Sequence, residues 1–263
     1  MKRASTLLKN LFFVFFCGAA GIFLSSCGLE EVIVVDEPTV TYNDPLYSST
    51  EYLTWYHSFK TSNDSGDSFI GTDVYYKIYN NSSSLTSQRA SILNVNTTSN
   101  GSAAATRMIE TYSYQQLGAS ASTGNSVYFP STERNRTVVF RLKTYANADA
   151  ASANNDDRYT MHACVGVKQT NATKYDYRDY IPFRNGNAKS FDFFDDDDDD
   201  DDETRDVEPV EGDADYYYTA TASEDDTYYV QLFAVGVAFD SSSVSNSYSL
   251  VLDLGSVPIR KNQ

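Results

Sequence analysis

The sequence predicts a mainly β protein, an antiparallel two-sheet β-sandwich with a short helical insertion around residues 85–117 and an acidic loop. Tyr and Phe number 21 and 15 among 263 residues, and aromatic side chains favour strands. Several segments alternate apolar and polar residues with the period of two that is typical of half-buried strands. The 41% hydrophobic composition is sufficient for one packed core.

The strand assignments rest on this alternation. In "TVVFRLKTY", Val138, Phe140 and Leu142 share one face of the expected strand. The segment "TYYVQLFAVGVAF" is apolar on both faces, as a central strand would be, and the polar residues "DSSSVSN" join it to "SYSLVLDLG" as a hairpin. Further strands are expected at 39–43, 52–59, 73–80, 159–168 and 215–222.

The insertion around 85–117 has a different period. "LTSQRASILNVN" and "SAAATRMIETYSYQQLG" space their apolar residues three and four apart, which predicts one or two short helices. The second segment runs to Gly118, a residue type that often ends a helix, so we expect the helix to end there.

The amino terminus has the features of an export signal. The basic "MKRASTLLKN" precedes the apolar residues 11–24, whose 14 residues fall short of the roughly 18 needed for a membrane span. The next residues, Leu24-Ser25-Ser26-Cys27, resemble the lipobox of bacterial lipoproteins. The resemblance implies cleavage between Ser26 and Cys27, removal of residues 1–26, and a diacylglyceryl group on the Cys27 sulfur. The alternative is an uncleaved anchor helix, which leaves the small residues before the cysteine unexplained.

Lipidation would hold the protein to a membrane through its acyl chains, since a second chain makes such anchoring stable. Residues 27–37 would form a tether, 38–258 the β domain and 259–263 a tail. Gly28 is not the aspartate that resembles an inner-membrane retention signal, which favours the outer membrane, at its periplasmic face or the cell surface. With Cys27 lipidated, Cys164 would be the one free thiol left in the exported body, so no intramolecular disulfide is expected.

The acidity is concentrated in residues 192–215, which carry 15 acidic side chains and one basic one. The run of eight aspartates at 195–202 cannot pack, so it predicts a solvated loop. Oxygen ligands such as Asp195, Asp197, Asp199 and Asp201 could capture Ca²⁺, although the run lacks the spaced ligands and glycine of an EF-hand loop, which would make the site weak. Clustered Lys and Arg are absent from the sequence, which argues against nucleic acid as a partner.

The outer strands show a second resemblance. "EPTVTY", "YLTWYHSF", "DVYYKIYN" and "DDTYYVQLFAVG" follow one another in an order similar to the strands of fibronectin type III domains, a fold with an immunoglobulin-like sandwich. The resemblance matches Trp55 to a strand-B tryptophan and Tyr76 to a strand-C tyrosine. It matches the pattern of strand F to Tyr228, Val230, Leu232 and Ala234. Residues 81–214 would then be an insertion between strands C and F.

Motifs for nucleotide binding, acyl transfer and zinc are absent from the sequence. His162 and Cys164 share a face of their expected strand and could form a reactive pair, but their strand favours a structural role, and His57 is expected at the edge of the core. We expect a non-catalytic binding, adhesion or structural lipoprotein without a cofactor, whose protein or glycan ligand is unknown. The alternatives are a divalent-cation-binding protein and an envelope enzyme acting on glycans.

Overall fold

The computed structural model describes residues 33–40, 57–119, 127–142, 162–165, 182–184, 189–191, 193, 208–220 and 227–260. The chain divides into two units, residues 1–33 and 34–263, and the described residues after Ile33 belong to the second. The prediction of a mainly β protein with antiparallel sheets is confirmed. No helix within the described ranges has the length and apolar character to cross a membrane.

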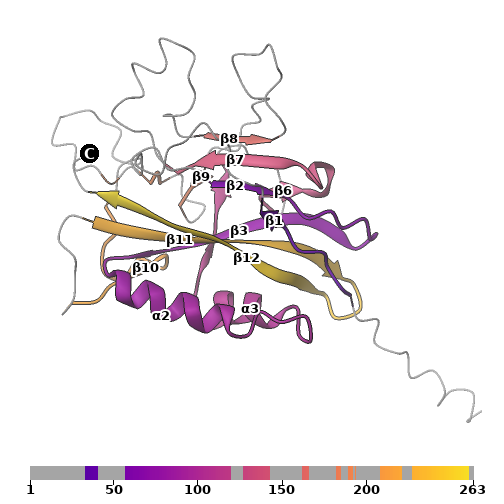
Figure 1. The fold of residues 1–263 in the computed structure, drawn as a ribbon, viewed down its shortest axis with the longest axis horizontal. Helices are drawn as coiled ribbons and strands as arrows, with labels where there is room; N and C mark the ends of the chain where they lie inside the picture. The colour runs from indigo at the N-terminus through magenta and orange to yellow at the C-terminus, as the bar shows by residue number, and fades with distance from the viewer. Residues whose placement is uncertain are drawn as a thin grey trace, which may run out of the picture. The chain divides into compact units, whose positions relative to one another are not determined.

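The larger sheet is built on three long antiparallel strands, β3 (Phe69–Tyr79), β11 (Thr227–Asp240) and β12 (Ser245–Arg260) (Figure 1). The expected hairpin between β11 and β12 is confirmed. Three short strands pair one after another along the other edge of β3: β6 (Phe129–Pro130), β4 (Gln115–Gln116) and β10 (Tyr216–Tyr217). β10 is parallel to β3.

The second sheet contains β1 (Thr39–Val40), β2 (His57–Lys60), β7 (Thr137–Arg141) and β8 (His162–Val165), paired in that order and antiparallel. Segment 81–214 therefore supplies two strands of this sheet as well as the helices. Two smaller elements complete the described chain: a two-stranded pairing of β5 (Gly118–Ala119) with β9 (Pro182–Phe183), and a short 3₁₀ helix, η3 (Ser131–Glu133).

The helical insertion is confirmed, but one of its boundaries was predicted wrongly. Helix α2 (Ser82–Leu93) begins after Asn81, whose side chain accepts a hydrogen bond from the Ser84 amide, a normal N-cap. Helix α3 (Ala103–Thr106) continues as the π-helical turn η2 (Arg107–Thr111) and ends there instead of at Gly118. The chain turns at Ser113, with φ 54°, because the following residues join the sheet: the Leu117 amide donates to the Val74 carbonyl.

Both faces of the larger sheet are buried, as the apolar pattern of β11 predicted. One face packs on the four-stranded sheet, and the other packs on α2 and α3 (Figure 1). Alternation along each strand divides the side chains between two cores. The inter-sheet core includes Phe59, Val74, Tyr76, Ile78, Val138, Val230, Leu232, Ala234, Val257 and Ile259. The helix-side core includes Tyr75, Tyr79, Leu85, Ile92, Ala104, Met108, Phe233, Val235, Val237 and Val251.

Candidate functional site

The residues that the sequence nominated lie mostly outside the described residues. These are the cleavage and lipidation positions Ser26 and Cys27 and the candidate cation ligands, Asp195, Asp197, Asp199 and Asp201. The backbones of His57, His162 and Cys164 are described in β2 and β8 of the four-stranded sheet. Both strands pair with β7, so Phe140 lies opposite His57 on one side and Ala163 on the other.

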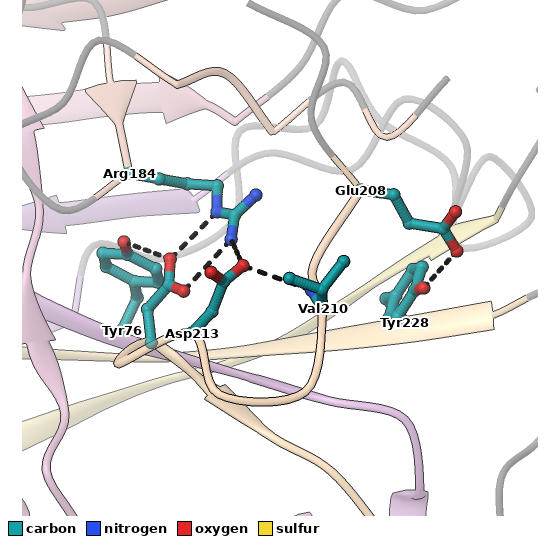
Figure 2. A network of polar contacts seen from close by, with 7 residues as sticks. Tyr76, Arg184, Glu208, Val210, Asp213 and Tyr228 are labelled. Carbon is teal, nitrogen blue, oxygen red and sulfur yellow. Dashed lines mark hydrogen bonds and ion pairs between the residues drawn. The ribbon is translucent and has the colours of Figure 1, made fainter. Parts of the chain in front are cut away.

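A buried polar cluster forms around Arg184, at the base of the acidic segment (Figure 2). The Arg184 Nε donates to Asp215 Oδ2 over 2.9 Å, and Nη2 donates to Asp215 Oδ1 over 3.0 Å, a bidentate pair. The same Nη2 reaches Asp213 Oδ2 at 3.2 Å. The Tyr76 hydroxyl, from the middle of β3, donates to Asp215 Oδ2 over 2.8 Å.

The ion pair is nearly sealed from water, since only 1% of the Arg184 surface and 2% of the Asp215 surface are exposed. Burial alone would lower the pKa of Arg184, but the hydrogen bonds and negative charge of Asp215 outweigh burial and raise it. The guanidinium also lies over the Phe193 ring, 5.5 Å from its centre. Arg184 is therefore permanently charged, and its guanidinium binds carboxylates and an aromatic ring of the same chain.

This cluster fastens both flanks of residues 194–207, the interval that contains the aspartate run. Before the interval, Phe191 and Phe193 are buried against Tyr76 and Tyr228, with ring centres 5.0 and 5.2 Å apart. After it, the Glu208 carboxylate accepts a hydrogen bond from the Tyr228 hydroxyl (Figure 2). The aspartate run 195–202, predicted to be solvated, lies outside the described residues, whereas Asp215 near the end of the acidic segment is buried, because its carboxylate neutralises a buried guanidinium.

A second polar group of residues lies between α2 and the larger sheet. The Arg89 guanidinium pairs with Asp253, whose other oxygen accepts from the Gln231 amide over 2.8 Å. Gln231 Oε1 is buried and has no hydrogen-bond partner among the described residues. Lys77, opposite Gln231 in the register of β3 and β11, donates to the Tyr112 carbonyl, and burial lowers its pKa. These contacts hold the helix layer to the sheet.

A third polar group surrounds Asp73, a buried acidic residue whose hydrogen-bond partners come from other segments of the chain. Its Oδ1 accepts from the Tyr128 amide over 2.7 Å and from the Gln116 side chain over 2.9 Å. Burial raises the pKa of this carboxyl from 3.8 to about 7, against the lowering effect of both hydrogen bonds. Asp73 thus ties β3 to the segments on either side of residues 120–126.

The described residues contain no group of three or more His, Cys, Asp or Glu side chains that could hold a metal ion. Comparison of the chain with protein-family models, curated proteins and solved structures finds no match. Sequence reasoning missed Arg184, Asp213 and Asp215. The one available signal was an isolated arginine in "YIPFRNGN" with two aspartates spaced i, i+2 before a strand, which is too common a pattern to nominate a cluster.

Replacing Arg184 tests how much the cluster stabilises the fold. Arg184→Met should lower the free energy of unfolding by about 3–5 kcal/mol, because it leaves the Asp215 carboxylate buried without its countercharge. Adding Asp215→Leu to that variant should recover part of the loss. Urea unfolding measures both effects. Arg89→Met is the matched control: that side chain is 43% exposed, and the loss should be about 1 kcal/mol or less. Equal losses at the two arginines would contradict the assignment.

Asp73 predicts a pH dependence of stability. Its pKa is higher in the folded chain, so the folded state binds the proton more tightly than the unfolded state does. The free energy of unfolding should therefore fall as the pH rises from about 4 to about 7, by a contribution on the order of 4 kcal/mol. Asp73→Asn keeps an acceptor oxygen and should abolish this contribution in urea titrations at several pH values. An identical pH profile in the variant would contradict the prediction.

Proposed function

We propose that the protein is a lipid-anchored lipoprotein of a bacterial envelope whose body is a non-catalytic binding, adhesion or structural module. The proposal is carried by the lipobox-like Leu24-Ser25-Ser26-Cys27, which follows an apolar run of signal-peptide length. The structure adds a supporting detail. Val35 and Pro38 are buried in the body, so seven residues separate Cys27 from Val35, the first buried residue that the structure describes.

The arrangement of charged residues supports a module without catalysis. In each of the three polar groups described above, the charged side chain is bound to another segment of the same chain. Arg184, Lys77 and Asp73 are all nearly sealed from water. A catalytic group must instead be able to reach a substrate. The buried charges therefore serve the body's own structure.

The sandwich is proposed to be fibronectin III-like or immunoglobulin-like. In that architecture strands A, B, E and D form one sheet and strands C, F and G form the other. The order β1-β2-β7-β8 corresponds to the first sheet and β3-β11-β12 to the second. The chain departs from the pattern in two ways. The strand at the D position follows E in sequence, and a helix layer covers the outer face of the C-F-G sheet.

The residues that carried the resemblance support it further. Tyr76 and the four residues matched to the strand-F pattern, Tyr228, Val230, Leu232 and Ala234, all lie in the inter-sheet core. This is the face on which the conserved alternation of such a sandwich would lie. Trp55 lies outside the described residues.

The outer membrane is the proposed location, at either the periplasmic face or the cell surface, and the ligand would be a protein or a glycan. Tyr217 and Tyr218 at the β10 end of the body are 40% and 42% exposed. Exposed tyrosines offer flat amphipathic surfaces of the kind that both ligand classes use. Protease accessibility of the intact cell distinguishes the two leaflets.

Metabolic labelling tests the anchor. A palmitate analogue should label the wild-type protein and Cys17→Ala, because Cys17 lies in the segment that is removed. Cys27→Ala should lose the label, since the sulfur that would carry the acyl group is then absent. Cys164→Ala is a second control and should keep its label. Label that persists in Cys27→Ala would refute the assignment.

Cation binding is the second candidate function, favoured by the aspartate run 195–202 and by the buried residues that flank the run on both sides. Calorimetry with Ca²⁺ should give a dissociation constant no tighter than about 0.1–1 mM, since the run has no shaped ligand loop. The matched control replaces residues 195–202 with eight asparagines, which keeps the length and removes the charge. Heats that are the same in both proteins would exclude this function.

A further inference from the structure

The residues before β1 are fixed against the larger sheet. The Asp36 amide donates to Asp64 Oδ2 over 3.0 Å, and the Ser62 hydroxyl donates to the Asp36 carbonyl over 2.7 Å. Val35 is buried beside Gly236 of β11, where a Cβ atom would lie 2.5 Å from the Asp36 carbonyl oxygen. Gly236 thus allows the chain to enter at one defined point.

This entry point lies toward the end of the sheet that carries the β11–β12 hairpin. From Gly236, β11 continues for four residues to Asp240, a distance of about 14 Å. The Phe239 amide donates to the Ser68 carbonyl. Ser68 lies four residues after Asp64, whose carboxylate accepts from the Asp36 amide. Figure 1 shows the indigo segment that precedes β1 running to the same end as the hairpin. The seven residues 28–34 span at most about 25 Å, so a lipidated Cys27 would keep this end near the bilayer.

The hairpin has an unusual residue at its tip. Val244 has φ 54°, a conformation that β-branched residues adopt rarely and that Gly or Asn normally supplies in such turns. The Val244 side chain is also 76% exposed. Asp240 fixes the turn, accepting from the Ser242 and Ser243 hydroxyls over 2.7 Å each. The turn therefore exposes an apolar side chain to solvent. It also places Val244 in a backbone conformation that valine disfavours.

Two other exposed apolar side chains lie toward the same end: Phe239, 42% exposed, and Val34, 80% exposed. Val34 directly precedes the buried Val35. Single exposed apolar residues are ordinary, but these three all lie toward the hairpin end of the body. A strained residue that is otherwise unexplained is a reason to look for a function.

We propose that the β11–β12 hairpin is a membrane-contact element, with Val244 and Phe239 resting in the interfacial layer of the bilayer that holds Cys27. The inference rests on the proposed lipid anchor. The neighbouring charges identify the lipid class: Asp36 and Glu37 are exposed, and hydrogen bonds from Ser242 and Ser243 lower the pKa of Asp240 to about 2. Asp240 at the turn, with Asp36 and Glu37 toward the same end of the body, favours zwitterionic headgroups and opposes anionic ones.

Fluorescence quenching tests the contact in the acylated mature protein, residues 27–263. Val244→Trp and Phe239→Trp are each reconstituted into phosphatidylcholine vesicles with brominated or ordinary acyl chains. The added tryptophan should emit about twofold less in brominated vesicles, since interfacial side chains lie about 5–10 Å into the headgroup–acyl boundary. Emission from the parent protein corrects for Trp55. Val210→Trp is the matched control: this residue is exposed at the β10 end and should not be quenched.

Two further variants separate contact from structure. Val244→Asn suits the left-handed conformation, so it should unfold at a higher denaturant concentration and yet reduce the quenching of a tryptophan at 239. Anionic phosphatidylglycerol in the vesicles should also reduce the quenching. If tryptophans at 239 and 244 are quenched no more than one at 210, the inference is overturned.

Vesicle flotation distinguishes this result from a failure of the anchor. A parent protein that floats and carries the palmitate label, with a Cys27→Ala variant that carries none, establishes the anchor; absent quenching then rejects the hairpin contact alone. A parent protein that does not float rejects both proposals.

Discussion

The burial of β11 on both faces is the constraint on which the rest of the structure depends. Its side chains alternate between two cores, with Leu232 facing the second sheet and Phe233 facing the helices. Each fully buried apolar side chain of this size contributes about 1.5–3 kcal/mol, so neither face can be left open. A two-sheet sandwich covers one face only. The helices of segment 81–119 are therefore a required third layer, and their position follows from the sequence of the strand that they cover.

Two-sided burial also determines where charges can lie. A charged group inside such a sheet must be paired, and its partner must come from another part of the chain. The carboxylate of Asp215 meets Tyr76, which is 139 positions earlier, and Arg184, which is 31 positions earlier. The pairs therefore close long loops, and the acidic run lies within both of them. The same contacts that satisfy the buried charge thus fix described residues on both sides of the acidic run.

Local patterns predicted the fold better than they predicted the site. Period-two alternation identified β7 and β12, and an apolar pattern on both faces identified β11, because burial of one or both strand faces imposes these patterns directly. The end of the second helix was wrong because tertiary pairing decided it: Leu117 bonds to β3, and a glycine at 118 carries no information about that contact. Arg184 was missed for a related reason. Its partner lies beyond the acidic run, and no local pattern records which of many aspartates will be buried.

Three non-glycine residues among the described ones adopt positive φ, and Val244 at the hairpin tip differs from the other two. Asn135 is a residue type that tolerates this conformation, and its amide donates to the Ser62 carbonyl. Ser113 ends a helix so that the chain can rejoin the sheet. Val244 serves neither purpose, since its side chain suits neither the turn nor the solvent around it. A chain whose local and global preferences otherwise agree breaks that agreement where something outside the fold is contacted. Under the proposed lipid anchor, the membrane would be such a surface.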